Sequence, residues 1–433
     1  MSDAERVRDF QVKIYRKAKQ EPKFRFYVLY DKIRSMHFLG HAYKLVRANK
    51  GSAGVDGKTF AEIERYGVGK YLTEIQKELE LKTYHPQAVK RVYIPKAKGK
   101  QRPLGIPTIK DRIVQMSCKL VVEPIFEADF TDDSYGFRPK RKASDAIKAI
   151  KAELVKGATE VYDADLSKYF DTIPHRELLI VFAQRVSDKN VIHLIKMWMK
   201  SPIEEDGQLR KSKTGTPQGG VISPLLSNIY LNLLDKIVSR ADRIFHQTGI
   251  KIIRYADDFI LIGKQITEAS MEYLADILGR MQLTLNSEKS KLVNPGEEPF
   301  TFLGFEFAYH KDLHGRNRKY LNIQPSKKSQ SKVREKVRDY LSKNGHQNPA
   351  ELSEGLNMIL RGWLNYFSIK GVSYPAMAKR ELRYYLYDRI NRYYGRKSQR
   401  KSKLYNQRAF EELVRKYKLI DPTKYSTRQP AKA

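Results

Sequence analysis

Two adjacent carboxylates, Asp257 and Asp258, offer the clearest chemistry in this sequence. Strand-like apolar runs flank them at residues 252–255 and 259–262, so a β-hairpin would bury both runs and project the acids at its tip. Adjacent strand residues point to opposite faces, so the two acids would share one site through the geometry of the turn. A bound divalent cation would offset their mutual repulsion. An isolated Asp-Asp pair is more often a plain surface turn, so the interpretation needs a second acidic strand.

The second acidic strand is expected at residues 160–171, where the two-residue period places Asp163 and Asp165 on one face. Carboxylate oxygens are the hard ligands that Mg²⁺ accepts while it keeps several waters and shares its shell with substrate phosphates. Two such ions about 4 Å apart could activate an attacking hydroxyl and stabilise a departing pyrophosphate. The pattern therefore predicts phosphoryl transfer at Asp165, Asp257 and Asp258. For Asp163, a salt bridge to one of the many lysines is the favoured interpretation.

Composition limits the classes of partner. The chain has 433 residues, with 82 Lys and Arg against 49 Asp and Glu, and its formal charge of +33 favours a polyanion such as nucleic acid. An anionic membrane is the rival partner, but no apolar run approaches bilayer length and no signal-peptide pattern is present, so we expect a cytoplasmic protein without membrane contact. The single cysteine, Cys118, excludes an intrachain disulfide framework and a Cys-rich zinc module of the type that carries a nuclease.

The hydrophobic pattern predicts an α+β region followed by an all-helical one. The helices expected are residues 7–47, 61–81, 107–124, 144–155, 327–343, 352–367 and 374–394, and the strands are 89–94, 160–171 and the acidic hairpin. Strand signals disappear beyond about residue 326. The segments expected are an N-terminal helical extension and loop at 1–60, a mixed antiparallel sheet with helices at 61–325, a helical domain at 326–395 and a short basic tail at 396–433.

An ordered series of motifs accompanies these acids. The series comprises Ile94-Pro95-Lys96, Arg102-Pro103-Leu104-Gly105-Ile106-Pro107, Thr216-Pro217-Gln218-Gly219-Gly220, Ser223-Pro224-Leu225-Leu226-Ser227-Asn228, Asn286-Ser287-Glu288-Lys289, Phe302-Leu303-Gly304-Phe305 and Arg361-Gly362-Trp363-Leu364-Asn365-Tyr366-Phe367. Together with Tyr255-Ala256-Asp257-Asp258, the series resembles the reverse transcriptase family, and more closely the group II intron-encoded reverse transcriptases and maturases. The likeness covers roughly residues 44–307 and extends into the maturase thumb.

The resemblance implies a right-hand polymerase, with fingers and palm at 61–325 and a helical thumb, or maturase domain, at 326–395. It implies an RNA-directed DNA polymerase that takes an RNA template, a DNA or RNA primer and deoxynucleoside triphosphates. Two Mg²⁺ ions would be held by the three acids and the backbone carbonyl of Leu166. The resemblance further implies that the protein binds group II intron RNA and assists its splicing and retrohoming.

Several side chains would bind the incoming nucleotide. Phe170 would lie beneath the sugar and clash with a 2′-hydroxyl, with plain core packing as the alternative. Lys96 and Arg102 flank a Gly/Lys-rich turn that could bring both cations over phosphate oxygens, and a solvated basic loop is the alternative. Gln218 precedes a helix start, where its amide could hydrogen-bond the nucleotide.

The remaining motifs have roles in pyrophosphate, primer and RNA binding. Lys289 would protonate or neutralise the pyrophosphate, and Lys291 is close enough in sequence to be the alternative. The resemblance places the primer grip at Phe302, Leu303 and Gly304, and RNA contacts at Arg138, Arg361 and Trp363. Basic and aromatic residues mixed on helices suit an A-form duplex, so RNA binding should weaken steeply with salt.

Three functions remain open at this point. The first is a polymerase that also serves as a splicing cofactor for its own intron, and the second is a similar polymerase serving DNA repair or a defence system. The third is an RNA-binding splicing cofactor with little polymerase activity. The third is disfavoured because the three acids occur together with the cations Lys96 and Arg102 and with the loop that carries Gln218. The form expected lacks the zinc/HNH endonuclease domain, so independent cleavage of a DNA target is not expected.

Overall fold

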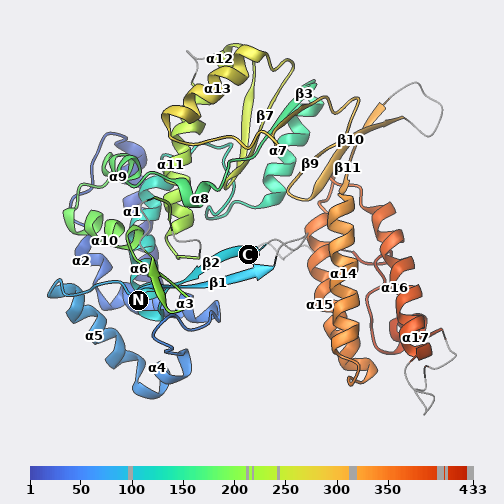
Figure 1. Cartoon of the computed structure of the whole chain (residues 1–433), viewed down its shortest axis with the longest axis horizontal. Helices are drawn as coiled ribbons and strands as arrows, with labels where there is room; N and C mark the ends of the chain where they lie inside the picture. Colours follow the sequence, from blue (N-terminus) through green and yellow to red (C-terminus); the bar gives the residue numbers. More distant parts are fainter. Residues whose placement is uncertain are drawn as a thin grey trace. The chain divides into compact units, whose positions relative to one another are not determined.

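The computed structural model describes residues 1–95, 101–210, 214–216, 219–240, 244–311, 319–396, 404 and 408–426. The chain forms two units (Figure 1). The first contains Met1–Lys142 and Tyr162–Lys291, and the second contains Ala143–Val161 and Leu292–Ala433. These units divide the chain elsewhere than the boundaries expected from the sequence, so the limits of fingers, palm and thumb stay a prediction.

The first unit contains many helices. They are α1 (Asp3–Gln20), α2 (Tyr30–Ile33), α3 (Met36–Ala48), α4 (Phe60–Tyr66), α5 (Val68–Glu80), α6 (Ile109–Glu127), α8 (Tyr169–Thr172), α9 (His175–Ala183), α10 (Lys189–Met199), α11 (Ser223–Val238), α12 (Ile244–Gln247) and α13 (Glu268–Arg280). Buried residues lie on every side of α6, and α1 and α3 pack against it. A helix that is buried on every side lies inside the unit.

Pro124 lies inside α6, although the helix was expected to end there. Proline lacks the N–H that would bond the carbonyl of Leu120, four residues earlier. The side-chain amide of Gln11, on α1, donates to that carbonyl at 2.9 Å. Because a neighbouring helix satisfies the freed carbonyl, α6 continues to Glu127.

A break at residues 21–29 separates α1 from the helices that follow, so the single helix expected at 7–47 is wrong. The backbone N–H groups of Leu29 and Tyr30 donate to the carboxylate of Asp188, each at 2.9 Å. These bonds reach a residue far along the chain and replace helical ones, so hydrophobic periodicity alone does not reveal the break.

The segment expected as one helix at 61–81 is two, α4 and α5. Gly67, with φ 105°, lies between them, in a conformation that L side chains rarely adopt. Thr59 begins α4 with a reciprocal capping box in which Glu62 is the partner. The strand expected at 89–94 is found where the sequence placed it.

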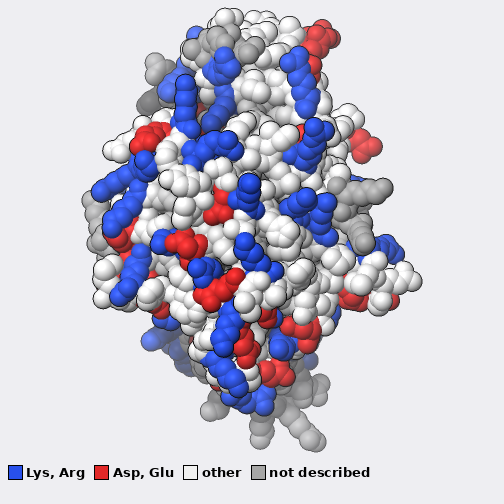
Figure 2. Space-filling view, turned by 90° about the vertical axis from the view of Figure 1, so that its left-hand side faces the viewer, with Lys and Arg blue, Asp and Glu red and all other residues white. Residues whose placement is uncertain are grey.

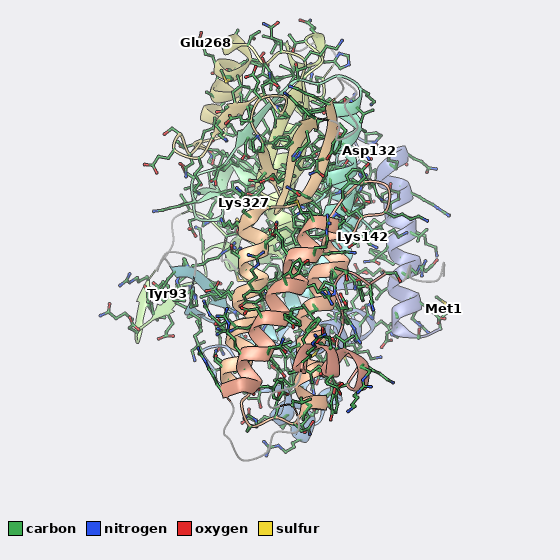
Figure 3. The ribbon with its side chains drawn as sticks, turned by 90° about the vertical axis from the view of Figure 1, so that its right-hand side faces the viewer. Met1, Tyr93, Asp132, Lys142, Glu268 and Lys327 are labelled. Carbon is green, nitrogen blue, oxygen red and sulfur yellow. The ribbon has the colours of Figure 1, made fainter. Side chains whose placement is uncertain are left out.

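That strand belongs to a sheet with the order β2 (Gln101–Ile106), β1 (Val89–Pro95), β4 (Ile203–Glu205) and β5 (Gln208–Arg210). β1 is antiparallel to β2 and parallel to β4. Tyr93, labelled in Figure 3, lies on β1 opposite Pro103 and is exposed. β1 and β2 therefore form a hairpin, whose connecting residues 96–100 lie outside the described residues.

A second sheet has the order β6 (Lys251–Tyr255), β7 (Asp258–Gly263), β3 (Glu160–Ala164) and β8 (Lys291–Val293). β6 and β7 are antiparallel neighbours in sequence. β3 comes from almost a hundred residues earlier, yet it is hydrogen-bonded beside β7. The two acidic strands expected from the sequence thus lie side by side, which the α+β fold achieves by a crossover.

The second unit combines a small sheet with helices. Its elements are α7 (Ala143–Val155), β9 (Phe300–Phe302), β10 (Phe305–Lys311), β11 (Lys319–Pro325), α14 (Lys327–Lys343), α15 (Pro349–Phe367), α16 (Ala376–Arg396) and α17 (Ala409–Lys416). The strand order is β11-β10-β9, and Figure 3 marks Lys327 at the start of α14. Val337, Leu356 and Leu386 are fully buried among the helices. The α+β class with a helical C-terminal region is confirmed.

The segment expected as a basic tail at 396–433 contains the helix α17. Ala409, Phe410 and Leu413 on α17 are buried, and α17 packs against α16. Asp421 beyond it pairs with Arg383 at 3.0 Å. The described part of this segment is thus held in the second unit by an amphipathic face and is not only a solvated extension.

Candidate active site

The acidic hairpin, defined as β6, β7 and the turn between them, has the conformation expected from the sequence. Tyr255 pairs with Asp258, which leaves Ala256 and Asp257 as the two turn residues. Apolar residues on both strands are buried. Ala256 has φ 60°, a left-handed conformation that costs about 1–3 kcal/mol in a residue other than glycine. Such a conformation persists only where the surroundings hold it, so the turn is fixed from outside.

Asp165 lies directly after β3, because the strand ends at Ala164 and not at the expected residue 171. Its backbone carbonyl accepts from the N–H of Asn286 at 2.8 Å, and its own N–H donates to the hydroxyl of Ser290 at 3.2 Å. The segment around Asn286 therefore holds the chain at Asp165 in place.

Leu166, expected to supply a carbonyl ligand, forms an antiparallel bridge with Leu285. The hydrogen bonds of this bridge are made by the neighbouring residues. The N–H of Ser167 donates to the carbonyl of Thr284, and the N–H of Asn286 donates to that of Asp165. In such a non-hydrogen-bonded pair, the N–H and C=O of the bridged residue point away from the partner strand. The carbonyl of Leu166 is thus directed away from Leu285.

Four carboxylates interact electrostatically at this site. Burial, followed by the charges of Asp257, Asp165 and Asp163, raises the pKa of Asp258 to about 6. Burial also raises the pKa of Asp257, with Asp165 adding to the shift. The fold therefore brings Asp165, Asp257 and Asp258 within range of each other's charge, as the sequence predicted. The repulsion is the property that a bound cation would relieve.

Asp163 also belongs to this acidic group. Burial and then the charge of Asp165 raise its pKa to about 6, while Lys291 acts in the opposite direction. Lys291 is thus near Asp163, and the expected salt bridge of Asp163 with one of the lysines stays a prediction. The alternative role for Lys291, on pyrophosphate, has no further support from the structure.

Lys289 extends to Asp165, with its Nζ 2.8 Å from Oδ2. Its ammonium occupies the position where a cation would balance that carboxylate. Across the described ranges, no three Asp, Glu, His or Cys side chains are gathered as a ready metal cage. The donors nevertheless suit Mg²⁺, since they are carboxylate oxygens, and burial followed by the charges of neighbouring acids raises the pKa of Asp258. Lys289 would compete with a metal ion for this carboxylate.

The fingertip residue Arg102 lies on β2 opposite Ile94 and is exposed. Its positive charge partly opposes the rise that burial causes in the pKa of Asp257. Arg102 on β2 is therefore close enough to the acidic hairpin to act on it electrostatically. Gly219, with φ 112°, lies against Gly105 so closely that a Cβ would collide with its carbonyl oxygen. Lys96 and Gln218, the other two expected nucleotide contacts, lie outside the described residues.

Phe170 is 8% exposed and packs edge-on against Tyr169, with ring centroids 5.5 Å apart. Its backbone carbonyl accepts from the N–H of Thr216 at 2.7 Å. A Cβ on Gly215 would lie 2.6 Å from the same oxygen. Phe170 therefore has a fixed backbone beside Gly215 and Thr216, and its action on the sugar stays a prediction.

The expected primer grip forms a turn in the second unit. Phe302 is 4% exposed, so its ring is a core side chain. Leu303 has φ 50° and Gly304 has φ 81°. Tyr366 donates to the carbonyl of Leu303, and Ser329 donates to that of Gly304, both at 2.9 Å. Helices α14 and α15 thus anchor the turn, and the contact with a primer stays a prediction.

The three expected RNA contacts have different surroundings. The guanidinium of Arg138 is buried, pairs with Glu127 at 2.7 Å and donates to the carbonyl of Ser134 at 2.7 Å. Trp363 is 9% exposed and packs against Phe367. Only Arg361 among the three is exposed. Arg138 and Trp363 are positioned as structural side chains, which leaves their expected contact with RNA without support.

The sequence reading missed Arg254, which lies on β6 and is 0% exposed. Its side chain pairs with Asp235 and bonds Asn228, both on α11. A charged residue within an apolar strand, next to the acids, was the available signal. Its partners could not be identified without the fold.

The surface agrees with the excess of positive charge. Figure 2 shows one face, on which Lys and Arg side chains cover more area than Asp and Glu and are mixed with them. Within the part of the chain that the structure describes, no helix combines the length and apolar character needed to cross a bilayer. Such a surface suits a polyanion bound over a wide area.

Comparison with known families assigns the class of protein. The family model described as "Reverse transcriptase (RNA-dependent DNA polymerase)" matches residues 94–307. The model "Group II intron, maturase-specific domain" matches residues 330–410. The first range contains the acidic hairpin and Asp165, and the second contains α15 and α16. The chain is a reverse transcriptase, an RNA-directed DNA polymerase.

Individual relatives agree with this class. "Protein YkfC" of Escherichia coli (strain K12) is 36% identical over 353 residues, which are 72% of this chain and 91% of the relative. "Group II intron-encoded protein LtrA" of Lactococcus lactis subsp. cremoris is 31% identical over 62% of this chain, which spans 55% of that relative. A solved structure, "Partial Cas6-RT-Cas1--Cas2 complex", matches 58% of this chain and 40% of its own at 24% identity and TM-score 0.37. The chain belongs to the group II intron-encoded reverse transcriptases and maturases.

Proposed function

We propose that this chain extends a DNA or RNA primer on an RNA template from deoxynucleoside triphosphates, with Asp165, Asp257 and Asp258 as the ligands of two Mg²⁺ ions. The supporting observation is the electrostatic coupling of these acids, which come from strands far apart in sequence. When bound, Mg²⁺ would activate the primer hydroxyl and neutralise charge on the phosphates. Burial first raises the pKa values of Asp257 and Asp258, and such raised values are the expected property of a site built for that charge.

The basic side chains around the acids have complementary tasks. Arg102, whose charge already reaches Asp257, holds the triphosphate with its planar fork. Lys289 leaves Asp165 and turns to the pyrophosphate, where it neutralises the leaving group or donates a proton. The exposed position of Lys289, at 62% of its side chain, leaves room for this movement. Phe170 excludes ribonucleotides from its fixed position beside Gly215 and Thr216.

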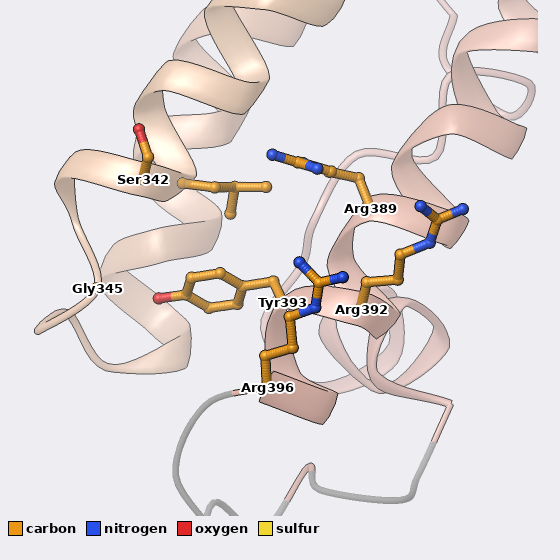
Figure 4. Close-up of a pocket in the computed structure, with 7 residues that line it drawn as sticks. Ser342, Gly345, Arg389, Arg392, Tyr393 and Arg396 are labelled. Carbon is orange, nitrogen blue, oxygen red and sulfur yellow. The ribbon is translucent and has the colours of Figure 1, made fainter.

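The second unit supports binding of group II intron RNA. A cavity of about 300 Å³ lies between the end of α14 and α16, and Figure 4 shows Arg389, Arg392 and Arg396 around it with Tyr393. Arg392 pairs with Asp388 at 2.7 Å. Arginine forks match phosphate oxygens, so the cavity suits the RNA backbone more than a base edge. We assign the maturase role to this helical surface together with Arg361.

Primer extension tests the polymerase proposal. Asp257→Ala should abolish extension of a primer on a long RNA template with Mg²⁺, because the site loses a metal ligand. RNA affinity should change little, since an acid near phosphates contributes no attraction without its metal. Asp276→Ala is the matched control, because Asp276 is an exposed acid paired only locally with Arg280. Equal extension by Asp257→Ala and the parent would disprove the assignment.

Filter binding of a group II intron RNA tests the maturase proposal. Arg389→Ala should weaken binding and lower the dependence of log K on log[salt] by about 1, the change expected for one lost phosphate contact. Arg338→Ala is the control, because Arg338 is on α14 and already pairs with Glu335 and Asp339. An unchanged salt slope for Arg389→Ala would remove the cavity from the RNA surface.

A further inference from the structure

The acidic hairpin carries Asp257 in its turn and Asp258 at the start of β7, and the turn has a strained backbone. Ala256 holds a left-handed φ of 60° without being glycine. Asp257 and Asp258 are adjacent carboxylates, and two like charges so close together repel each other. A strained turn with like charges needs external contacts to keep one geometry. The buried side chain of Arg254 supplies such a contact.

Arg254 joins the turn to α11 through a buried network. Its Nη1 donates to the backbone carbonyl of Ala256 at 2.8 Å and to Oδ1 of Asn228 at 2.8 Å. Its Nε and Nη2 both bond Asp235, at 2.8 Å and 2.5 Å. Arg254 is 0% exposed and Asp235 is 1% exposed, so water does not compete for these groups.

The network extends to a third segment. The side-chain amide of Asn228 donates to the carbonyl of Gly136 at 2.8 Å. The N–H of Arg254 donates to the carbonyl of Asp133, and the N–H of Tyr135 donates to the carbonyl of Arg254, both at 2.9 Å. The hairpin is thus held by α11, through the guanidinium of Arg254, and by residues 133–136, through the backbone of Arg254 and the side chain of Asn228.

We propose that Arg254 is a positioning residue for polymerisation, which fixes the carbonyl of Ala256 and so aims Asp257 and Asp258, with Asp235 and Asn228 as its rigid anchors. The proposal rests on the proposed two-metal function of the acids. The planar guanidinium of arginine is essential, because Nε and Nη2 must bind Asp235 while Nη1 reaches the turn. A buried pair kept only for stability would not need the second arm.

A double variant separates positioning from stability. Arg254→Met with Asp235→Leu removes both charges together, and well-packed apolar residues in place of a buried ion pair are often neutral or stabilising. We expect a folded protein with primer–template affinity within about twofold of the parent, and kcat lower by about 100-fold, as for a misplacement of catalytic groups near 1 Å. Amide exchange of residues 253–260, followed by mass spectrometry, should accelerate in the same variant.

The matched control is Arg185→Lys. Arg185 is 5% exposed, pairs with Asp129 at 3.0 Å and donates to backbone carbonyls, but none of these contacts involves the acidic hairpin. This control should lower thermal stability and leave kcat and the hairpin exchange unchanged. It shows what loss of a comparable buried fork does elsewhere in the same unit.

A single variant keeps the proposal testable if the double variant does not fold. Arg254→Lys preserves the charge opposite Asp235 but lacks the second arm, so kcat should fall by at least about tenfold with the nucleotide KM unchanged. Parental kcat or parental amide exchange in a folded Arg254 variant would overturn the positioning role. An inactive parent, in contrast, would overturn the polymerase proposal itself, so the two failures are distinguishable.

Discussion

Gly136 gives the sharpest test of how the acidic hairpin is held. A Cβ added at Gly136 would lie 2.8 Å from the carbonyl carbon of Tyr255 and still closer to the backbone nitrogen of Ala256. The carbonyl of Gly136 accepts from the side-chain amide of Asn228, so the backbone at Gly136 cannot move away from the turn without losing this bond. Gly136→Ala must therefore displace the turn that carries Asp257.

The size of the displacement follows from these distances. Ordinary van der Waals contact begins at 3.4 Å, so the backbone at Ala256 must move by roughly 1 Å. Overpacking of this kind costs about 1–3 kcal/mol of stability. A shift near 1 Å at catalytic groups can reduce the rate by about 100-fold. A 100-fold loss of rate corresponds to about 2.7 kcal/mol, so the effect on kcat should be at least comparable to the effect on stability.

Single-turnover primer extension with saturating Mg²⁺ measures this loss. Gly279→Ala, on α13, is the control, because its Cβ would meet no atom within 4 Å. Gly279→Ala should leave the rate unchanged and stabilise the helix by up to about 1 kcal/mol. If Gly136→Ala extends primers as fast as Gly279→Ala, the turn does not depend on this close approach and the reasoning fails.

Two further predictions concern the same site. Phe170→Ala should raise incorporation of ribonucleotides relative to deoxyribonucleotides, because the ring would no longer meet the 2′-hydroxyl; unchanged discrimination in competition assays would return Phe170 to a purely structural role. Asp163 and Asp258 have pKa values raised to about 6 from the usual 3.8, so the folded protein binds more protons than the unfolded chain between about pH 4 and 6. Their contribution to stability is therefore present at low pH and is lost as the pH rises through about 6. With Mg²⁺ chelated, the protein should resist urea better at about pH 5 than at about pH 7, and Asp258→Asn should reduce that difference. An equal difference in Asp258→Asn and the parent would show that other groups control it.

The acidic hairpin and the helices beyond residue 326 could be predicted from the sequence alone. Both depend on local patterns, an alternating apolar run that ends in two acids and helical stripes with caps, and local patterns do not need the rest of the chain. The convergence of Asp165 with Asp257 was also predictable, but only through the ordered motif series. Spacing alone cannot say which strands become neighbours in a sheet.

The surroundings of those acids depend on the folded structure. It interrupts the helix expected at 7–47 near Leu29 and Tyr30, whose N–H groups donate to Asp188, and it directs Arg138 inward to Glu127. It also placed Lys289 on Asp165 and enclosed Arg254 between α11 and the residues around Gly136. Each of these contacts joins residues whose separation along the chain carries no periodic signal, so burial and hydrogen-bond satisfaction in the folded core choose the partners.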